Sequence, residues 1–271
     1  MKEDTHSSIP ISELISQILE ISKSQGNLLL GMIYGSQKKG DDLDILLIYN
    51  NNVKQFPVYD NNVRKNILAN NFDIGQIEIN NFQKKIFYRD IQYTDKILTG
   101  KYLCGNKDIF EKAKDFLINT SPNKHIYDYL GKRSIETFLQ ADQYYFLAKR
   151  ELFAEMLISN MSWSKMKNYF FETGFELDSE ILNKSIFINL NYSLSILSYS
   201  LSYLSSIKRY KKGERTVTLQ GILDNPLNQI ENELKNLRNY FKLCYKKEKK
   251  ISLDKINSYF GDVKALLNEE I

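Results

Sequence analysis

Two aspartates separated by one residue form the pattern in this sequence that most directly suggests chemistry. Asp42 and Asp44 stand at the start of the apolar stretch 43–49, which is typical of a buried strand. Alternate side chains on a strand share a face, so we expect the two carboxylates to project together. Carboxylates held this close raise each other's pKa unless a cation neutralises them, and Mg²⁺ prefers oxygen ligands. The pair therefore predicts a divalent-metal site.

The residues just before this pair are of the types that hold phosphate. Gly35 and Ser36 directly follow a second apolar stretch, 28–34, and Lys38 and Lys39 come next. A glycine at the end of a strand lets the backbone turn sharply and approach a ligand closely. Backbone amides and a hydroxyl can then hold phosphate oxygens beside the two ammonium groups. The turn could thus hold a triphosphate on one side and a metal on the other. An ordinary turn with a solvated polar tip is the alternative.

A third carboxylate, Glu78, lies in the alternating stretch 72–79, which predicts a third strand. If that strand neighbours the one that carries Asp44, Glu78 would complete a cluster of three carboxylates. The pair Asp42 and Asp44, if it bridges two metal ions, could clamp the attacking and leaving oxygens of an in-line phosphoryl displacement. A glutamate on a solvated strand face is the alternative interpretation.

A polar segment that contains Pro122, residues 119–124, predicts a boundary between two domains. Strands come before it and helices after it, which indicates an α+β fold: a mixed sheet flanked by helices over 1–120 and an all-α helical bundle over 125–271. In the first domain we expect helices over 10–24, 61–70 and 107–117, strands over 28–34, 43–49 and 72–79, and an edge strand over 100–105. In the second we expect helices over 126–158, 162–172, 178–209, 226–247 and 252–269.

Composition excludes several classes of protein. The 271 residues carry a formal charge of +4, which by itself is too small to indicate nucleic-acid binding. Two distant cysteines, Cys104 and Cys244, suggest no disulfide framework, and the N-terminus lacks the apolar core of a signal peptide, so we expect a cytoplasmic protein. With only His6 and His125, a histidine-based triad or zinc site is disfavoured.

The long segment 187–207 has the length of a membrane span and is followed by a basic run. It also contains two asparagines and seven serines. We therefore interpret it as a buried helix of a bundle and expect no membrane association.

The motifs together resemble the DNA polymerase β-type nucleotidyltransferase superfamily, in which a strand, Gly-Ser, a loop and Asp-x-Asp precede an acid on a later strand. The resemblance covers roughly residues 10–115. A helical domain that follows is similar to the arrangement in kanamycin- and streptomycin-type nucleotidyltransferases, and in the minimal nucleotidyltransferases paired with HEPN toxins. The matching positions are Gly35-Ser36, Asp42-Leu43-Asp44 and Glu78.

The resemblance implies transfer of a nucleoside monophosphate from an NTP, expected to be ATP, to a hydroxyl group, with release of pyrophosphate. It implies Mg²⁺ on Asp42 and Asp44, and Glu78 as either a metal ligand or the general base. Catalysis would then consist mostly of positioning and charge neutralisation.

For the nucleotide, the resemblance implies that Gly35 and Ser36 hold the triphosphate, with Lys39 beside them. Lys149, on the first long helix of the second domain, is a further phosphate-contact candidate; a solvated helix position is the alternative. The loop from Ser36 to Asp42 is shorter than is usual in the superfamily, and Asp41 stands where a serine is common.

The acceptor we expect is a hydroxyl of a small molecule, such as an aminoglycoside-like antibiotic. Two alternatives stay open: nucleotidylation of a protein or a tRNA, and a non-catalytic protein that acts as an antitoxin-like partner or a nucleotide sensor. Related antibiotic enzymes are sometimes dimeric, so the resemblance leaves both a monomer and a homodimer open.

Overall fold

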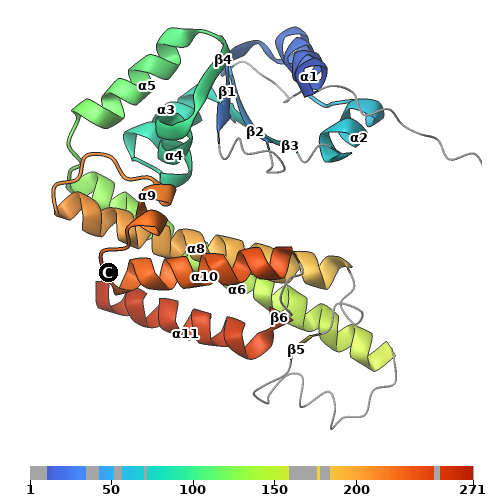
Figure 1. Ribbon diagram of the computed structural model, residues 1–271, viewed down its shortest axis with the longest axis vertical. Helices are drawn as coiled ribbons and strands as arrows, with labels where there is room; N and C mark the ends of the chain where they lie inside the picture. The colour runs from blue at the N-terminus through green and yellow to red at the C-terminus, as the bar shows by residue number, and fades with distance from the viewer. Residues whose placement is uncertain are drawn as a thin grey trace, which may run out of the picture. The chain divides into compact units, whose positions relative to one another are not determined.

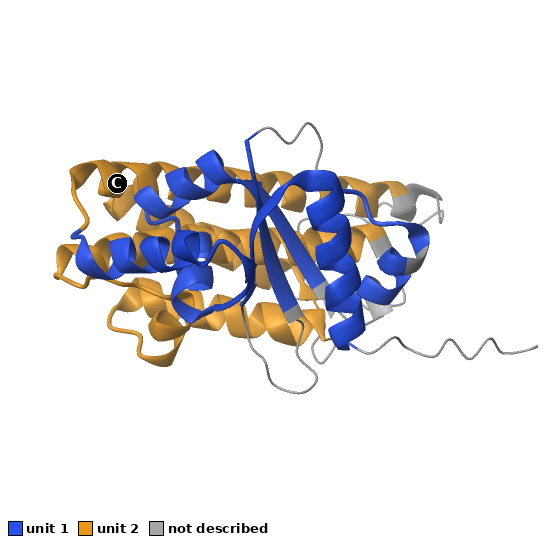
Figure 2. Ribbon diagram, turned by 90° about the horizontal axis from the view of Figure 1, so that it is seen from above, with its two compact units in different colours: residues 1–121 blue, residues 122–271 orange. Residues whose placement is uncertain are grey.

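The computed structural model of this chain describes residues 11–34, 43–51, 57–69, 72–158, 176–177, 184–246 and 251–270. The chain divides into two compact units, residues 1–121 and 122–271, which Figure 2 shows in different colours. The first unit contains a four-stranded mixed sheet with helices, and the described part of the second is almost entirely helical. The predicted α+β class with a helical C-terminal region is confirmed at this level.

The sheet of the first unit has the strand order β3-β2-β1-β4. The two central strands are the apolar stretches that the sequence indicated, and β4 is a short edge strand with exposed residues. Strand β2 runs antiparallel to β1 but parallel to β3, so the chain needs a crossover between β2 and β3, which includes α2 (Asn61–Ala69). The strands are β1 (Leu28–Tyr34), β2 (Leu43–Tyr49), β3 (Phe72–Glu78) and β4 (Lys101–Gly105).

Alternate side chains of the strands pack into two separate hydrophobic cores, one on each face of the sheet. Ile45 and Leu47 pack on one face with Leu14 of α1 (Ile11–Gly26) and with α2. Leu46, between them, faces the opposite core, which includes Phe82. Figure 1 shows the two groups of helices on either side of the strands. The helices of the second face are α3 (Ile79–Phe87), α4 (Ile91–Thr99) and α5 (Lys107–Asn119).

Helices α3 and α4 occupy a stretch for which the sequence pattern gave no prediction. Arg89 lies at the turn between them with φ of 53° and a fully buried side chain. Its guanidinium donates hydrogen bonds to the carbonyl oxygens of Leu117 (3.0 Å) and Thr120 (2.5 Å). These carbonyls lie at the C-terminal end of α5, where backbone acceptors lack helical partners and the helix dipole favours a cation. Arg89 thereby fixes α5 to the α3–α4 pair.

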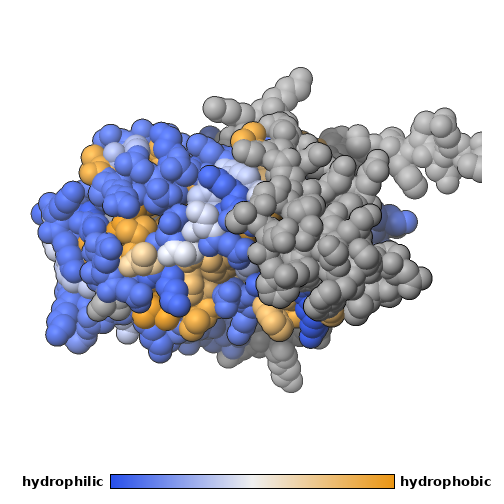
Figure 3. Space-filling model, turned by 90° about the horizontal axis from the view of Figure 1, so that it is seen from below, coloured by the Kyte–Doolittle hydropathy of each residue, from blue (hydrophilic) through white to orange (hydrophobic). Residues whose placement is uncertain are grey.

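The second unit is built from long helices packed around α8 (Lys184–Lys211). The predicted helix 162–172 lies outside the described residues, while the other four predicted helices are present with shifted ends. The face that Figure 3 shows is mostly hydrophilic where it is described. The remaining elements are α6 (Lys124–Ile158), β5 (Glu176–Leu177), α9 (Leu219–Asp224), α10 (Gln229–Tyr245), β6 (Ile251–Ser252) and α11 (Leu253–Glu270).

Most serines of α8 are buried, and their hydroxyls are satisfied mostly by backbone carbonyls. Ser134 of α6 and Ser200 of α8 each donate a hydrogen bond to the other's carbonyl oxygen, at 2.7 and 2.8 Å. Ser202 and Ser206 donate to the carbonyls four residues earlier, at 2.7 and 2.8 Å. Such bonding lets small polar residues fill a helix–helix contact. In the described part of the chain, no helix has the length and apolar character needed to cross a membrane.

Candidate functional site

The strand register brings two carboxylates together at one end of the sheet. Asp44, the second residue of β2, pairs with Tyr34 of β1 on one side and with Asp73 of β3 on the other. Paired residues on neighbouring strands lie about 4.8 Å apart and point to the same face. Asp73 is exposed and Asp44 is half-buried. The two acids therefore form a pair that solvent can reach.

The face to which this pair belongs is fixed by the residues that follow on each strand. Leu46 comes two positions after Asp44 and Ile77 four positions after Asp73, and both belong to the core beneath α3, α4 and α5. Tyr34 belongs to the same core. Asp44 and Asp73 thus lie at the edge of that core, where the sheet end meets α4.

A lysine from α4 reaches this end of the sheet. The ammonium nitrogen of Lys96 lies 4.3 Å from the centroid of the Tyr34 ring and 5.3 Å from that of Tyr93. Aromatic faces at these distances attract a cation. The Lys96 ammonium therefore lies over the ring of Tyr34, the last residue of β1, near Asp44 and Asp73.

The electrostatics of the site are set mainly by the partial burial of Lys96. Burial disfavours the charged amine and lowers its pKa below the ordinary value. The negative charges of Asp73 and then Asp44 oppose this shift, with smaller contributions from Asp90 and Asp95. The ammonium is thus electrostatically coupled to both carboxylates, and it offsets part of their charge.

Gly75 of β3 lies close to the Lys96 ammonium. A Cβ at this position would lie 3.8 Å from the Lys96 nitrogen and 3.2 Å from the Leu46 Cδ1 atom. Gly75 follows Asp73 by two residues and so lies on the same face of β3. A Cβ here would make an ordinary van der Waals contact with Lys96, and only its contact with Leu46 would be tight. The Lys96 ammonium thus lies close to the face of β3 that carries Asp73.

The structure corrects the position that was predicted for Glu78. Glu78 is the last residue of β3, and it pairs with Tyr49 at the far end of β2 from Asp44. It lies five residues beyond Asp73, roughly 16 Å at about 3.3 Å per residue, and an odd separation places it on the opposite face. Glu78 therefore does not join Asp44 in a carboxylate cluster. Asp73 holds the place that Glu78 was expected to hold.

Four of the predicted site residues, Gly35, Ser36, Lys39 and Asp42, lie outside the described residues. Their attachment points are described, because Tyr34 ends β1 and Leu43 begins β2. The segment that contains them therefore leaves and re-enters the sheet at the end where Asp44 and Asp73 lie.

Lys149 belongs to the second unit. It lies on α6, with its ammonium 4.3 Å from the centroid of the Tyr145 ring on the preceding turn. Burial raises the pKa of the Tyr145 hydroxyl, which donates a 2.9 Å hydrogen bond to Asn257. Tyr145 thus supplies a local contact for Lys149. The role of Lys149 in phosphate binding stays a prediction.

Sequence reasoning missed Asp73 and Lys96. Asp73 had a usable signal, since it shares the parity of Gly75 and Ile77 in an alternating strand, but the choice between Asp73 and Glu78 depends on strand direction. Lys96 lies in a nine-residue helix whose buried positions are Ile91, Thr94 and Ile97. The spacing of these buried residues is helical, but the segment is too short and too polar for the pattern to predict a helix from sequence.

Among the described residues, no group of three or more histidine, cysteine, aspartate or glutamate side chains is arranged to hold a metal ion. The described part of the site contributes two carboxylates, and Asp42 lies in the segment outside the described ranges. Two carboxylates with open solvent access fit Mg²⁺, which is usually held by one or two carboxylates together with substrate phosphates.

Comparisons of the chain with protein-family models, curated proteins and solved structures found no match.

Proposed function

We propose that this protein is a Mg²⁺-dependent nucleotidyltransferase that acts at the sheet end defined by Asp44 and Asp73. The observation that carries the proposal is the strand register, which pairs these carboxylates on one face. The Gly-Ser segment attaches to the sheet at the same end. Acidic ligands for a metal and a glycine-containing segment for phosphates are the two parts that such a reaction needs.

In the proposed reaction, an acceptor hydroxyl of a small molecule forms a bond to the α-phosphorus of ATP. The bond from that phosphorus to the oxygen bridging to the β-phosphate breaks, and pyrophosphate leaves. Mg²⁺ bound by Asp42 and Asp44 would neutralise charge on the phosphates. Asp73, which is exposed beside Asp44, would accept the proton of the hydroxyl or complete the metal site. Lys96 would limit the repulsion between the carboxylates before the nucleotide binds.

A second candidate function is nucleotide binding without turnover, and Lys96 favours it. Its ammonium is coupled to both carboxylates and already offsets part of their charge. A site neutralised by its own lysine has less need of a metal ion than a site of carboxylates alone. A nucleotide sensor or an antitoxin-like partner would bind nucleotide with little dependence on Mg²⁺.

Calorimetric titration of the full-length protein with ATP, with and without Mg²⁺, tests these functions together with an assay of pyrophosphate release. The release assay uses aminoglycosides, proteins and tRNA as acceptors. For the enzyme we expect Mg²⁺-dependent binding and acceptor-dependent release of pyrophosphate. Asp42→Asn and Asp44→Asn should each weaken Mg²⁺-dependent binding at least about tenfold, a loss of about 1.4 kcal/mol.

The outcomes separate the candidates. Binding that is equal with and without Mg²⁺, with no pyrophosphate released for any acceptor, supports the non-catalytic protein. Mg²⁺-dependent binding that both aspartate variants retain would contradict the proposed metal site. No binding of any NTP by the wild-type protein would contradict both functions.

A further inference from the structure

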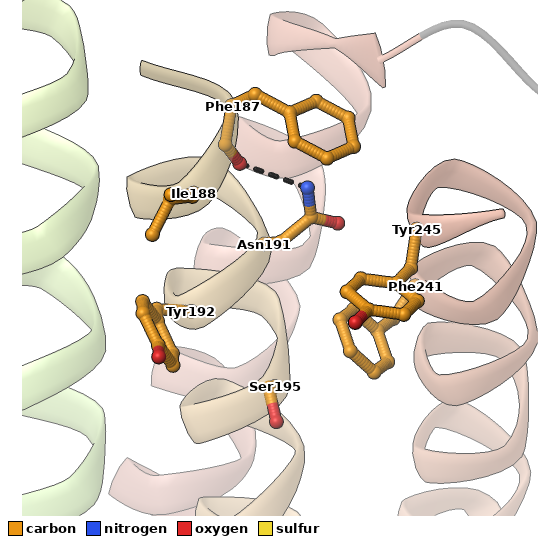
Figure 4. Close-up of a pocket in the computed structure, with 7 residues that line it drawn as sticks. All are labelled: Phe187, Ile188, Asn191, Tyr192, Ser195, Phe241 and Tyr245. Atoms are coloured by element: carbon orange, nitrogen blue, oxygen red, sulfur yellow. Dashed lines mark hydrogen bonds between the residues drawn. The ribbon is translucent and has the colours of Figure 1, made fainter. Parts of the chain in front are cut away.

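The second unit contains a pocket between two helices that the proposed function does not use. Its volume is about 270 Å³, just below the roughly 300–1,000 Å³ typical of small-molecule sites. The walls come from α8, including Phe187, Asn191 and Tyr192, and from α10, including Phe241 and Tyr245. Figure 4 shows the rings of Phe241 and Tyr245 on the side of α10 that faces α8. The pocket thus has the size of a one- or two-ring molecule.

The aromatic lining offers flat surfaces to such a molecule. The rings of Phe241 and Tyr245 lie 5.8 Å apart between centroids and are tilted by 39°. Tyr245 is 59% exposed, although it carries a large ring. Exposed aromatic side chains beside a pocket are typical of sites where a ligand covers them, because the ligand removes apolar surface from water.

Asn191 gives the pocket a polar group with a definite hydrogen-bonding role. Its side chain is 6% exposed, and its amide nitrogen donates a 2.8 Å hydrogen bond to the carbonyl oxygen of Phe187. That bond identifies the other side-chain atom as the oxygen, which has no hydrogen-bond partner in the protein. In Figure 4 this oxygen points into the space between α8 and α10. A buried acceptor left without a donor is unfavourable, so a ligand that supplies the donor would bind more tightly than one that does not.

From these contacts we infer that the pocket between α8 and α10 binds a small planar aromatic molecule that donates an N–H hydrogen bond to the Asn191 side-chain oxygen. The rings of Phe241 and Tyr245 contact its faces, and the amide oxygen selects the donor at its edge. This site belongs wholly to the second unit, and its existence does not depend on the proposed nucleotidyl transfer.

The test uses indole and 1-methylindole, which have the same ring system and differ in the N–H donor. Dissociation constants for the full-length protein are measured by ligand-detected NMR titration. We expect indole to bind about threefold to tenfold more tightly than 1-methylindole, the range for one net hydrogen bond of about 0.5–1.5 kcal/mol. In Asn191→Leu, which removes the acceptor at similar size, the two compounds should bind equally.

Two further variants keep the test independent of folding. Tyr245→Ser changes an exposed side chain and should weaken both compounds at least threefold without changing their ratio. Asn236→Leu, at an exposed position of α10 away from this pocket, should leave both constants unchanged. Equal affinity of the wild type for the two compounds, retention of the preference in Asn191→Leu, or no binding of either compound would overturn the proposal.

Discussion

Each unit contains a cluster of charged side chains, and the two clusters differ in their exposure to solvent. In the second unit, Arg209 and Glu231 form a buried pair with two nearly parallel hydrogen bonds of 2.9 and 2.8 Å, and Glu231 is fully buried. In the first unit, Asp44 and Asp73 lie at a sheet end that solvent reaches, next to a lysine that is only partly buried. One cluster is enclosed by the protein, and the other is open to a ligand.

The enclosed pair is closed by further hydrogen bonds. The second carboxylate oxygen of Glu231 also accepts from the Leu227 backbone at 2.6 Å, and the first accepts from the Asn228 side chain at 3.0 Å. Burial by itself would raise the pKa of the Glu231 carboxyl, but the hydrogen bonds from Arg209 and the Leu227 backbone outweigh it and lower that pKa. For Arg209, the hydrogen bonds to Glu231 raise the pKa despite burial. This cluster holds α8 and the start of α10 together. Both carboxylate oxygens of Glu231 are already hydrogen-bonded and buried, so they are not available to a ligand.

Exposure to solvent, rather than charge itself, distinguishes this candidate site from a structural ion pair. This distinction would fail if the pair of Arg209 and Glu231 contributed nothing to stability, or if the pair of Asp44 and Asp73 bound no ligand.

Arg209→Leu should produce the largest effect, a loss of stability of about 3–5 kcal/mol in the second unit. The reason is that Glu231 would keep a buried charge without its partner. Urea unfolding of the full-length protein, followed by circular dichroism, measures the change. The double variant Arg209→Leu/Glu231→Leu should recover much of the loss, because no uncompensated charge remains. A double variant as unstable as the single one would show that Arg209 acts mainly through its other contacts, such as Asn225.

Asp73→Asn tests the open pair, with Glu78→Gln as its matched control. If Asp73 is the third carboxylate, its loss should weaken Mg²⁺-dependent ATP binding about tenfold, or about 1.4 kcal/mol, as measured by calorimetry. Stability should change by no more than about 0.5 kcal/mol, because Asp73 is exposed. Glu78→Gln should leave ATP affinity unchanged, since Glu78 lies at the other end of β3. The reverse pattern would restore Glu78 as the functional acid and remove the basis for a site built on the strand register.

Asp73 and Glu78 also show which features of the site can be predicted from the sequence and which cannot. The three strands were predictable because apolar runs and alternation follow directly from burial on one or both faces. Alternation also separates Asp73 from Glu78 by face. It does not say which end of β3 meets Asp44, because that depends on the parallel pairing that the crossover through α2 produces. The choice of acid is therefore a property of topology and not of local pattern.

Lys96 and Asn191 were unpredictable for a related reason. Each derives its role from side chains distant in sequence: Tyr34 and Asp73 for Lys96, and Phe241 and Tyr245 for Asn191. Helical spacing identifies the buried positions of α4 and α8, but it does not indicate which polar residue meets a ring or a carboxylate of another element. Only the packed structure brings these groups together.

Lys96→Met should have the smallest effect and the most specific dependence on pH. The pKa of Lys96 in the folded protein is lowered from the ordinary lysine value of about 10.4, so the unfolded chain binds the proton more readily. Below the folded-state pKa the cost of holding the charged amine is fully present, and it is relieved as pH rises toward the unfolded value. Lys96→Met should therefore be more stable than the wild type at pH 7, by at most about 1 kcal/mol.

Thermal unfolding of both proteins from pH 7 to pH 10 measures this difference, which should shrink as pH rises. Lys84→Met, at an exposed position of α3, controls for the loss of one positive charge. If the wild type were instead the more stable protein at pH 7, the attraction of Asp73 and Asp44 would outweigh the burial of Lys96. The cluster would then be a structural ion pair like that of Arg209 and Glu231, and the distinction between an open and a closed cluster would fail. If the site is open, Lys96→Met should be more stable than the wild type at neutral pH. That result would show that the charged Lys96 is present at the site although its partial burial destabilises the fold.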